Sequence, residues 1–252
     1  MRQFVRRGCG HVLTAWVCAV LFVTVCFAGD QTQWGQAWTR NMVSNEVGLV
    51  EDFDPATGRN VKWVAPLGSE TWATPVVSQG RIFLGTNNDP PRDPRHKGDR
   101  SLLLCLDEKD GSLLWQLVVP KLGSDPYLDW PKAGVVSPAT VEGDRVYVVT
   151  NRGEVACLDI EGQRNGNDGP YLDEGRHMVP SDSEPLEVTA IDADILWLFD
   201  IPNQAGTWAH DGAHGSILID GDFLYVNTSN GVDNTHRAIR RPEGPSLICL
   251  DK

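Results

Sequence analysis

The stretch Cys105-Leu106-Asp107-Glu108-Lys109-Asp110-Gly111-Ser112-Leu113-Leu114-Trp115 decides the fold. It joins an apolar run that ends in Cys-Leu-Asp to an Asp-Gly turn, and the turn leads to a tryptophan. Asp and Gly favour tight turns, because an Asp carboxylate accepts backbone N–H groups and Gly adopts positive φ angles. We therefore predict a turn at Gly111 and a further strand that begins at Trp115.

The Cys-Leu-Asp motif and the tryptophan recur along the chain. The repeated residues are Cys105, Cys157 and Cys249, Asp107, Asp159 and Asp251, and Trp63, Trp115 and Trp197. The first two cysteines are 52 residues apart, as are the first two tryptophans, and a polar insertion at 163–194 lengthens the next interval. We predict buried cysteines, turn-forming aspartates and tryptophans packed between sheets. A disulfide or a reactive thiol is the alternative for the cysteines, and the insertion is expected to be a surface excursion.

A β-hairpin is predicted before each Cys-Leu-Asp strand. The paired runs are 75–77 with 82–86, 138–141 with 146–150, and 216–219 with 224–228. Each pair flanks a turn that contains glycine, which is typical of hairpins. A Trp strand, a hairpin and a Cys-Leu-Asp strand then make a four-stranded unit. Such units at 40–50 residues predict an all-β fold, a β-propeller of four-stranded blades. A β-sandwich does not require these positions to recur, and a parallel β-helix has shorter coils.

The N-terminus has the features of a secretory signal peptide: a positive start, an apolar run and a small-x-small cleavage site. The predicted divisions are a signal peptide at 1–28, an N-terminal lead-in segment at 29–60 and propeller blades at 61–252. We therefore expect a periplasmic or secreted protein with no membrane span in the mature chain. An uncleaved anchor is the alternative, although the apolar run is shorter than the roughly 20 residues of a bilayer span.

The formal net charge of the 252-residue chain is −12. Nucleic-acid binding depends on Lys and Arg residues that meet phosphates, so the acid excess argues against a nucleic-acid partner. Two loops, 87–100 and 229–245, nevertheless gather Arg and His residues. A solvated loop is the expected role for each, and contact with an anion or a partner is the alternative.

The stretch from Cys105 to Trp115 resembles the tryptophan-docking repeat of quinoprotein-type (PQQ-like) propellers, whose pattern is roughly Ala-x-Asp-x-x-Thr-Gly-x-x-x-Trp. Here Cys105 replaces Ala and Asp110 replaces Thr. The family includes quinone-dependent alcohol dehydrogenases and a non-enzymatic outer-membrane assembly lipoprotein. From Trp34 onward, the chain also resembles large secreted propellers of planctomycete-type bacteria. The resemblance implies a quinoprotein-like propeller of seven or eight blades. About three blades fit this length and the chain stops inside a repeat, so an incomplete N-terminal portion of a longer propeller is expected.

Candidate site residues follow from their places around the hairpins. The catalytic candidates are His210, Asp211 and His214, and the cofactor-binding candidates are Trp72, Trp208, Asn151 and Arg152. Thr-Trp-Ala recurs at both tryptophans, outside the docking set, and the Asn-Arg pair follows a central strand. A polar loop network is the expected role of the His-Asp-x-x-His cluster, with a metal or another active site as alternatives, so no metal site is predicted. Blade packing and strand capping are the competing roles for the others.

The expected function is an exported binding or scaffold module for other envelope proteins or a small-molecule ligand. The alternative is a PQQ- and calcium-dependent oxidoreductase acting on alcohols or sugars, in which Ca²⁺ is held by carboxylate and amide oxygens. Many such enzymes carry two adjacent cysteines over the cofactor, and no Cys-Cys pair occurs in this chain. The strong motifs are structural, which favours the binding role because a fold does not imply a function.

Overall fold

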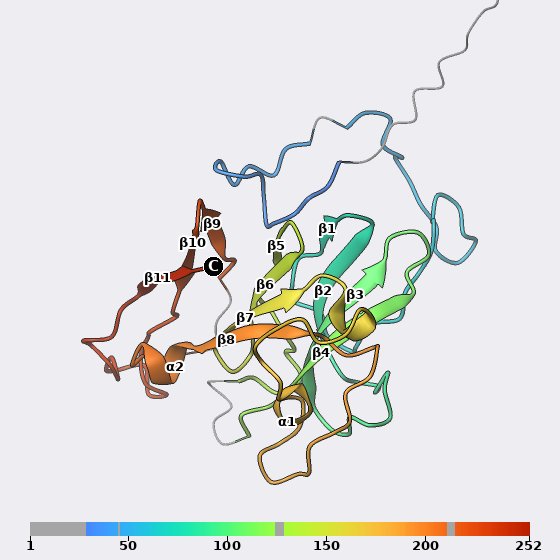
Figure 1. The fold of residues 1–252 in the computed structure, drawn as a ribbon. Helices are drawn as coiled ribbons and strands as arrows, with labels where there is room; N and C mark the ends of the chain where they lie inside the picture. The colour runs from blue at the N-terminus through green and yellow to red at the C-terminus, as the bar shows by residue number, and fades with distance from the viewer. Residues whose placement is uncertain (1–28, 45, 124–128, 211–214) are drawn as a thin grey trace, which may run out of the picture.

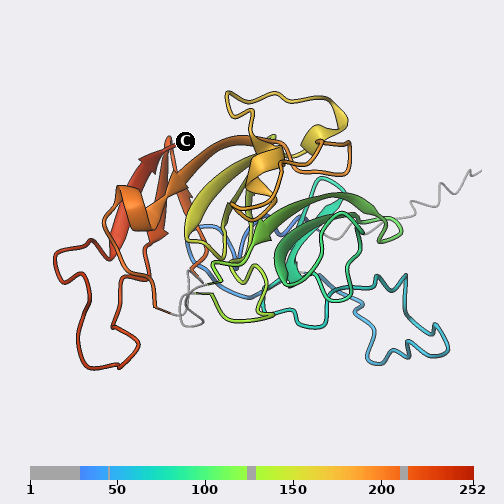
Figure 2. The same cartoon turned by 90° about the horizontal axis from the view of Figure 1, so that it is seen from below.

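The computed structural model describes residues 29–44, 46–123, 129–210 and 215–252, which form three antiparallel sheets (Figure 1). The predicted signal peptide lies outside the described residues. The sheets follow one another in chain order, and Figure 2 shows the same succession from below. No helix in the described ranges has the length and apolar composition that a bilayer crossing requires.

Two sheets have four strands and one has three. The first contains β1 (Val76–Ser78), β2 (Arg81–Asn87), β3 (Arg100–Asp107) and β4 (Leu113–Pro120). The second contains β5 (Thr140–Glu142), β6 (Arg145–Val149), β7 (Glu154–Asp159) and β8 (Ile195–Asp200). The third contains β9 (Leu218–Asp220), β10 (Phe223–Asn227) and β11 (Leu247–Asp251). The helices η1 (Gly162–Arg164), α1 (Glu174–His177) and α2 (Ile201–Gln204) are short. The predicted all-β fold and its hairpins are confirmed.

The Trp strand is the last strand of each four-stranded sheet, so the grouping expected from the sequence was wrong. Trp115 in β4 pairs with Cys105 in β3, and Trp197 in β8 pairs with Cys157 in β7. Trp63 lies in irregular chain before β1. One edge of each Cys-Leu-Asp strand is already paired with the second strand of the preceding hairpin. Its free edge therefore receives the Trp strand that follows, as sequential strands commonly do.

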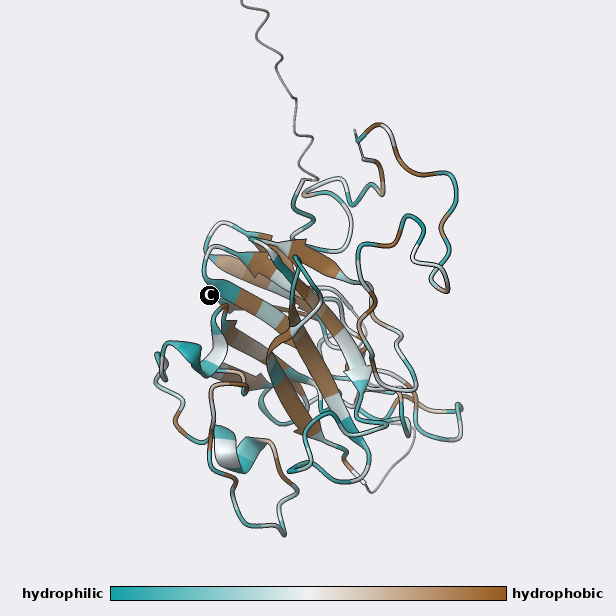
Figure 3. Ribbon diagram, turned by 90° about the vertical axis from the view of Figure 1, so that its right-hand side faces the viewer, coloured by the Kyte–Doolittle hydropathy of each residue, from teal (hydrophilic) through white to brown (hydrophobic). Residues whose placement is uncertain are grey.

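The core lies between the faces of neighbouring sheets. In the second sheet, Val148 and Ala156 pack toward the first sheet, whereas Val149 and Cys157 pack toward the third. Figure 3 shows hydrophobic residues concentrated in the strands and hydrophilic residues in the loops. Because both faces of the second sheet are covered, its strands are nearly continuous apolar runs rather than alternating ones.

Two tryptophans bond to later repeats in the same way. The indole N–H of Trp63 donates to the carbonyl of Glu108 at 3.0 Å, and that of Trp115 donates to the carbonyl of Ile160 at 2.9 Å. Each acceptor lies 45 residues after its tryptophan. A glycine with positive φ lies against each ring, where an added Cβ would be 2.6 Å from an indole carbon. These glycines are Gly111 for Trp63 and Gly162 for Trp115.

The aspartates of the repeated motif differ in what they bond. Asp107 accepts the backbone N–H of Lys109 at 2.8 Å, and Asp159 accepts that of Glu161 at 2.8 Å. Both geometries are Asx turns, in which the side chain satisfies an N–H two residues later. Asp251 ends β11, opposite Phe223, and is exposed.

The cysteines of the motif also differ. Cys105 and Cys157 are buried free thiols, and burial raises the pKa of each to about 12. Cys249 is an exposed free thiol, which corrects the expectation of a buried one. Cys105 faces the second sheet and Cys157 the third, so each cysteine faces the next sheet along the chain. Cys249 faces away from the second sheet, because Ile248 and Leu250 pack toward it. No described segment covers that face.

The insertion 163–194 contributes to the core, which corrects the expectation of a surface excursion. Its residues Met178 and Val179 are buried against Leu102 and Leu104 of β3, on the face of the first sheet that points away from the second. A polar composition suggested exposure, but a few apolar side chains are enough to cover this face.

The insertion also covers one edge of the first sheet. Gln116 of β4 donates its backbone N–H to Ile191 and accepts the N–H of Ala193, both at 2.9 Å. Between these two residues, Asp192 forms an ion pair with Arg95 at 2.8 Å. Arg95 belongs to the loop between β2 and β3, so the ion pair joins that loop to the insertion.

The lead-in runs past the first strand of all three sheets. Gln31 exchanges two backbone hydrogen bonds with Val77 of β1, at 2.8 and 3.0 Å, and the carbonyl of Thr32 accepts the N–H of Val141 in β5 at 2.8 Å. Arg40 donates a side-chain hydrogen bond to the carbonyl of Ile217, which immediately precedes β9, at 3.4 Å. The lead-in therefore bonds to edges that would otherwise be open.

Candidate functional site

A cavity of about 390 Å³ lies where β6 and β8 end, and we call it the strand-end pocket. Its lining residues are Leu122, Asn151, Arg152, Glu154, Asp200, Pro202, Asn203, Thr207, Trp208 and Ala209. Three of the residues predicted from the sequence to bind a cofactor, Asn151, Arg152 and Trp208, are therefore brought together. They come from the β6–β7 turn and from the segment after α2.

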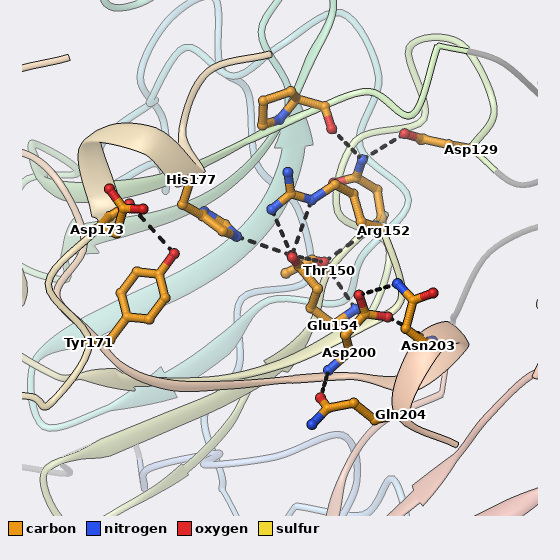
Figure 4. Close-up of polar contacts among 12 residues, drawn as sticks. Asp129, Thr150, Arg152, Glu154, Tyr171, Asp173, His177, Asp200, Asn203 and Gln204 are labelled. Atoms are coloured by element: carbon orange, nitrogen blue, oxygen red, sulfur yellow. Dashed lines mark hydrogen bonds and ion pairs between the residues drawn. The ribbon is translucent and has the colours of Figure 1, made fainter. Parts of the chain in front are cut away.

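Glu154 is the centre of the polar contacts in this pocket (Figure 4). Its carboxylate accepts hydrogen bonds from Arg152 Nη2 at 2.7 Å and from the Thr150 hydroxyl at 2.9 Å. His177 Nε2, from α1 in the insertion, lies 3.1 Å from the same carboxylate. A carboxylate and its partners are thus assembled from the second sheet and the insertion.

These contacts hold Glu154 in its ionised form. Burial of the side chain opposes ionisation, but the hydrogen bonds and charges of His177 and Arg152 outweigh burial and lower the pKa of Glu154 to about 2. A general base works best with a pKa near the operating pH. Glu154 is therefore a permanently charged ion-pair partner at neutral pH.

Asn151 is buried at the floor of the pocket. Its amide nitrogen donates to Asp129 Oδ2 at 2.7 Å and to the carbonyl of Pro120 at 3.2 Å. Asp129 also forms an ion pair with Lys121 at 2.7 Å. Asn151 Oδ1 is buried and has no hydrogen-bond partner among the described residues. The amide thus joins β4 to the β6–β7 turn and keeps one acceptor unused.

Trp208 forms one wall of the pocket. The guanidinium carbon of Arg240 lies 3.6 Å from the centroid of its ring, which is a cation–π contact. The backbone N–H of Trp208 donates to Asn230 Oδ1 at 2.9 Å. Its indole nitrogen is buried without a hydrogen-bond partner among the described residues. Arg240 comes from the loop 229–245, the second of the two loops that gather Arg and His residues. Part of that loop therefore contacts the pocket wall rather than solvent alone.

The other candidates lie elsewhere. His210 packs edge-on against His236, with ring centroids 4.7 Å apart and an interplanar angle of 87°. Asp211 and His214 lie outside the described residues. Trp72 is exposed and lines a second depression of about 560 Å³, which we call the indole recess. The recess is lined by Trp34, Glu70, Trp72, Thr74, Trp130, Pro131, Ala133, Val136 and Pro138.

Several residues of the strand-end pocket were not predicted from the sequence. Glu154 and His177 are 23 residues apart, and no local pattern pairs them. The carboxylate of Asp200 accepts hydrogen bonds from the backbone and side-chain nitrogens of Asn203, at 3.0 and 2.7 Å, and so caps α2. The Asp-x-x-Asn spacing at the end of an apolar strand was an available signal for this cap.

A separate cluster of side chains joins the loop 87–100 to the insertion 163–194. Asp93, His96 and Asp192 have potential ligand atoms within 4.8 Å of one another. Arg95, however, lies against both carboxylates, 2.6 Å from Asp93 and 2.8 Å from Asp192. Burial of its imidazole lowers the pKa of His96. One guanidinium thus bridges the two carboxylates and offsets one of their two negative charges, and the cluster fastens two loops together.

The strand-end pocket does not fit the calcium ion or the quinone of a quinoprotein dehydrogenase. Calcium needs six to eight oxygen ligands with free lone pairs. The carboxylates of Glu154 and Asp200 already accept hydrogen bonds from Arg152, His177 and Asn203. The quinone is a tricarboxylate, and since the charge of Arg152 is balanced by Glu154, the negative charge of Asp200 is left to repel it.

Known proteins that resemble the chain comprise one matching family and several solved structures. A model of the family described as outer membrane protein assembly factor BamB matches residues 28–247. No curated protein matches the chain. Among solved structures, the quinohemoprotein alcohol dehydrogenase ADHIIG from Pseudomonas putida HK5 is 17% identical, with a TM-score of 0.39. The quinohemoprotein alcohol dehydrogenase from Comamonas testosteroni is 12% identical with a TM-score of 0.37, and a europium-containing methanol dehydrogenase is 12% identical with a TM-score of 0.35.

The solved structures are much longer than this chain. The alignments cover 68%, 65% and 78% of this chain in the same order, but only 19%, 18% and 27% of those proteins. The chain thus spans less than a third of the length of each.

Proposed function

The chain belongs to the family described as outer membrane protein assembly factor BamB, and from this membership we propose that it is an exported, non-enzymatic binding or scaffold propeller for other envelope proteins. Its predicted divisions are unchanged in this proposal: a signal peptide at 1–28, a lead-in at 29–60 and blades at 61–252. The fold alone would not decide between binding and catalysis, because propellers of one family serve both.

The observation that carries the proposal is the state of Glu154 in the strand-end pocket. Its carboxylate is bonded to Arg152, Thr150 and His177, and its pKa is lowered to about 2. A carboxylate that acts as a general base needs a free lone pair and a pKa nearer to neutrality. These contacts support a structural role, in which the ion pairs fix the β6–β7 turn against the insertion.

The surface that we assign to a partner is the end of the sheets at which β2, β6 and β10 finish. The strand-end pocket and the indole recess both open there, and the connections after β4 and β8 leave the sheets at the same end. Loops on a rigid scaffold commonly carry binding residues. The opposite end has the short hairpin turns, such as that between β9 and β10.

Site-specific photo-crosslinking tests this assignment in the cells that make the protein. A photoreactive amino acid at Asn203, exposed beside the strand-end pocket, is expected to capture an envelope protein. The matched position is Asp222, which is exposed in the turn at the opposite end. Equal capture at both positions, or capture at Asp222 alone, would contradict the proposed surface.

A dye-reduction assay separates the binding role from a quinoprotein oxidoreductase. The full chain is supplied with PQQ, Ca²⁺ and a panel of alcohols and sugars, and we expect no turnover above that of the free quinone. Turnover that is saturable in substrate and lost in Glu154→Gln would overturn the proposal. The variant preserves the shape of the side chain but removes its charge.

A further inference from the structure

The indole recess brings together three tryptophans from separate parts of the chain. Trp34 comes from the lead-in, Trp72 from the connection into β1, and Trp130 from the connection between β4 and β5. Their side chains are 41%, 69% and 47% exposed. The volume of about 560 Å³ lies within the range of small-molecule sites, roughly 300–1,000 Å³.

The backbone that carries these tryptophans is held in place. The carbonyl of Glu70, two residues before Trp72, accepts the hydroxyl of the buried Thr86 at 2.9 Å. The carbonyl of Trp130 accepts a hydrogen bond from Lys121 Nζ at 2.8 Å. Trp34 lies in the part of the lead-in that bonds to β1 and β5. The three rings therefore project from anchored segments, which lowers the entropy cost of binding.

The charge of the recess is negative. Glu70 is the only charged residue among the described residues that line it, and its carboxylate accepts a hydrogen bond from Trp72 Nε1 at 3.1 Å. Lys132 follows the lining residue Pro131, but its amine forms an ion pair with Asp89 at 3.1 Å. The chain as a whole has a formal charge of −12. Among the described residues that line it, the recess thus offers one carboxylate and no cation.

This combination favours a cation that also has apolar surface. The face of an indole ring is electron-rich and attracts ammonium groups within about 6 Å, and aromatic cages use this attraction to bind quaternary ammonium. A carboxylate adds to the attraction and repels anions. A sugar would need several hydrogen-bonding side chains. Within the described part of the chain, Thr74 and Glu70 are the only polar side chains that line the recess apart from the indoles.

We propose that the indole recess binds a quaternary or alkylated ammonium group, with its methyl groups against Trp34, Trp72 and Trp130 and its charge near Glu70. The recess is distinct from the strand-end pocket, so this inference does not depend on the protein-binding role proposed above. The ammonium group is defined by its chemistry, and either a free solute or a lipid headgroup supplies it.

Titration calorimetry with choline tests the proposal on the full chain. The control ligand is 3,3-dimethylbutan-1-ol, which has the same shape as choline but carries carbon in place of the charged nitrogen. We expect choline to bind saturably and about 3- to 30-fold more tightly than the alcohol, the range of a cation–π contribution. Equal affinity for the two compounds, tighter binding of glucose, or no saturable binding of any ammonium probe would overturn the proposal.

Single substitutions test whether choline binds in the indole recess. Trp72→Ala should weaken choline binding at least about tenfold, and Glu70→Gln should weaken it several-fold while leaving the alcohol unaffected. Trp38→Ala is the matched control, because Trp38 is 70% exposed in the lead-in and does not line the recess. An equal loss in Trp38→Ala would contradict the assignment.

A vesicle experiment identifies the source of the ammonium group. Co-sedimentation with phosphatidylcholine vesicles but not with phosphatidylglycerol vesicles, lost in Trp72→Ala, would support a lipid headgroup. Binding of free choline without co-sedimentation would support a soluble ligand. Preference for phosphatidylglycerol, which carries no ammonium group, would contradict the proposal.

Discussion

The indole N–H of Trp115 donates to the carbonyl of Ile160, which fastens the last strand of the first sheet to the end of the Cys-Leu-Asp strand in the second. Trp63 makes the same bond to Glu108 over the same separation of 45 residues. Glu108 and Ile160 occupy equivalent places, immediately after Asp107 and Asp159. The Trp115 bond joins two sheets, and the Trp63 bond joins the irregular chain before β1 to the first sheet with the same geometry.

Replacing Trp115 with Ala should strongly destabilise the protein. The side chain is fully buried, and its removal leaves a cavity between two sheets and an unpaired carbonyl. We expect the free energy of unfolding to fall by about 3–5 kcal/mol in urea denaturation. The control Trp72→Ala removes an exposed indole and should change stability by less than about 0.5 kcal/mol. Similar losses in the two variants would contradict the fastening role.

Gly162→Ala should show that Trp115 needs a glycine beneath its ring. The position has a φ of 59°, and an added Cβ would lie 2.6 Å from the indole. Gly143 is the matched control, because its φ is 57° and nothing lies within 4 Å of its Cβ position. Both variants suffer the backbone strain, so Gly162→Ala should be less stable than Gly143→Ala by about 1–3 kcal/mol. Equal melting temperatures would show that the ring moves aside without cost.

The three described cysteines should differ in reactivity. Cys105 and Cys157 are buried with pKa values raised to about 12, whereas Cys249 is exposed. Because the thiolate is the nucleophile, iodoacetamide at pH 8 should label Cys249 first in the folded protein. Peptide mass spectrometry after labelling identifies the sites, and labelling in urea provides the reference for full exposure. Rapid native labelling of Cys157 would contradict the packing between the second and third sheets.

Glu154 should make the free energy of unfolding depend on pH. Its pKa falls from 4.5 to about 2 on folding, so its contribution is complete above about pH 5 and is lost as the pH falls toward 2. The difference amounts to about 3 kcal/mol. The stability advantage of the native protein over Glu154→Gln should therefore shrink across this interval, as urea denaturation at several pH values would show.

Arg95→Met should release the insertion from the loop between β2 and β3. It leaves the carboxylates of Asp93 and Asp192 buried without their cation, which costs about 3–5 kcal/mol. The double variant Arg95→Met with Asp192→Asn removes one of the two charges and should recover part of this loss. Limited proteolysis within 163–194 gives a second measurement, since cleavage should be faster in Arg95→Met. No recovery in the double variant would contradict the electrostatic explanation.

Local patterns in the sequence predicted much of the fold. The turn at Gly111, the hairpins and the Cys-Leu-Asp strands depend on neighbouring residues, and the structure contains them at those places. The assignment of strands to sheets depends on which strand pairs with each free edge. The spacing of the motifs along the sequence did not show that the strand of Trp197 pairs with that of Cys157. The exposure of Cys249 depends on what covers the third sheet, which a repeat cannot reveal.

The strand-end pocket was predicted only in part, for a similar reason. Asn151 and Arg152 stood out because they follow a central strand, and Trp208 because Thr-Trp-Ala recurs outside the docking set. All three line one cavity. Their chemical state depends on Glu154 and His177, which meet across 23 residues of chain through the buried insertion. The composition of that insertion indicated solvent exposure. The ion pair between Glu154 and His177 could therefore not be predicted from the sequence, because it forms only where the insertion packs against the sheets.

The bond between Arg40 and Ile217 sets an order of events in folding. It joins residues 177 positions apart, whereas each hairpin joins near neighbours, and closing longer loops costs more entropy. The hairpins should form first and the sheets should stack next, while the lead-in docks last. The lead-in is thus synthesised before the sheets but is among the last segments to be fixed. In a chain that emerges N-terminus first, Gln31 and Thr32 could attach once β1 and β5 had formed. Arg40 would stay unattached until Ile217 and the third sheet had arrived.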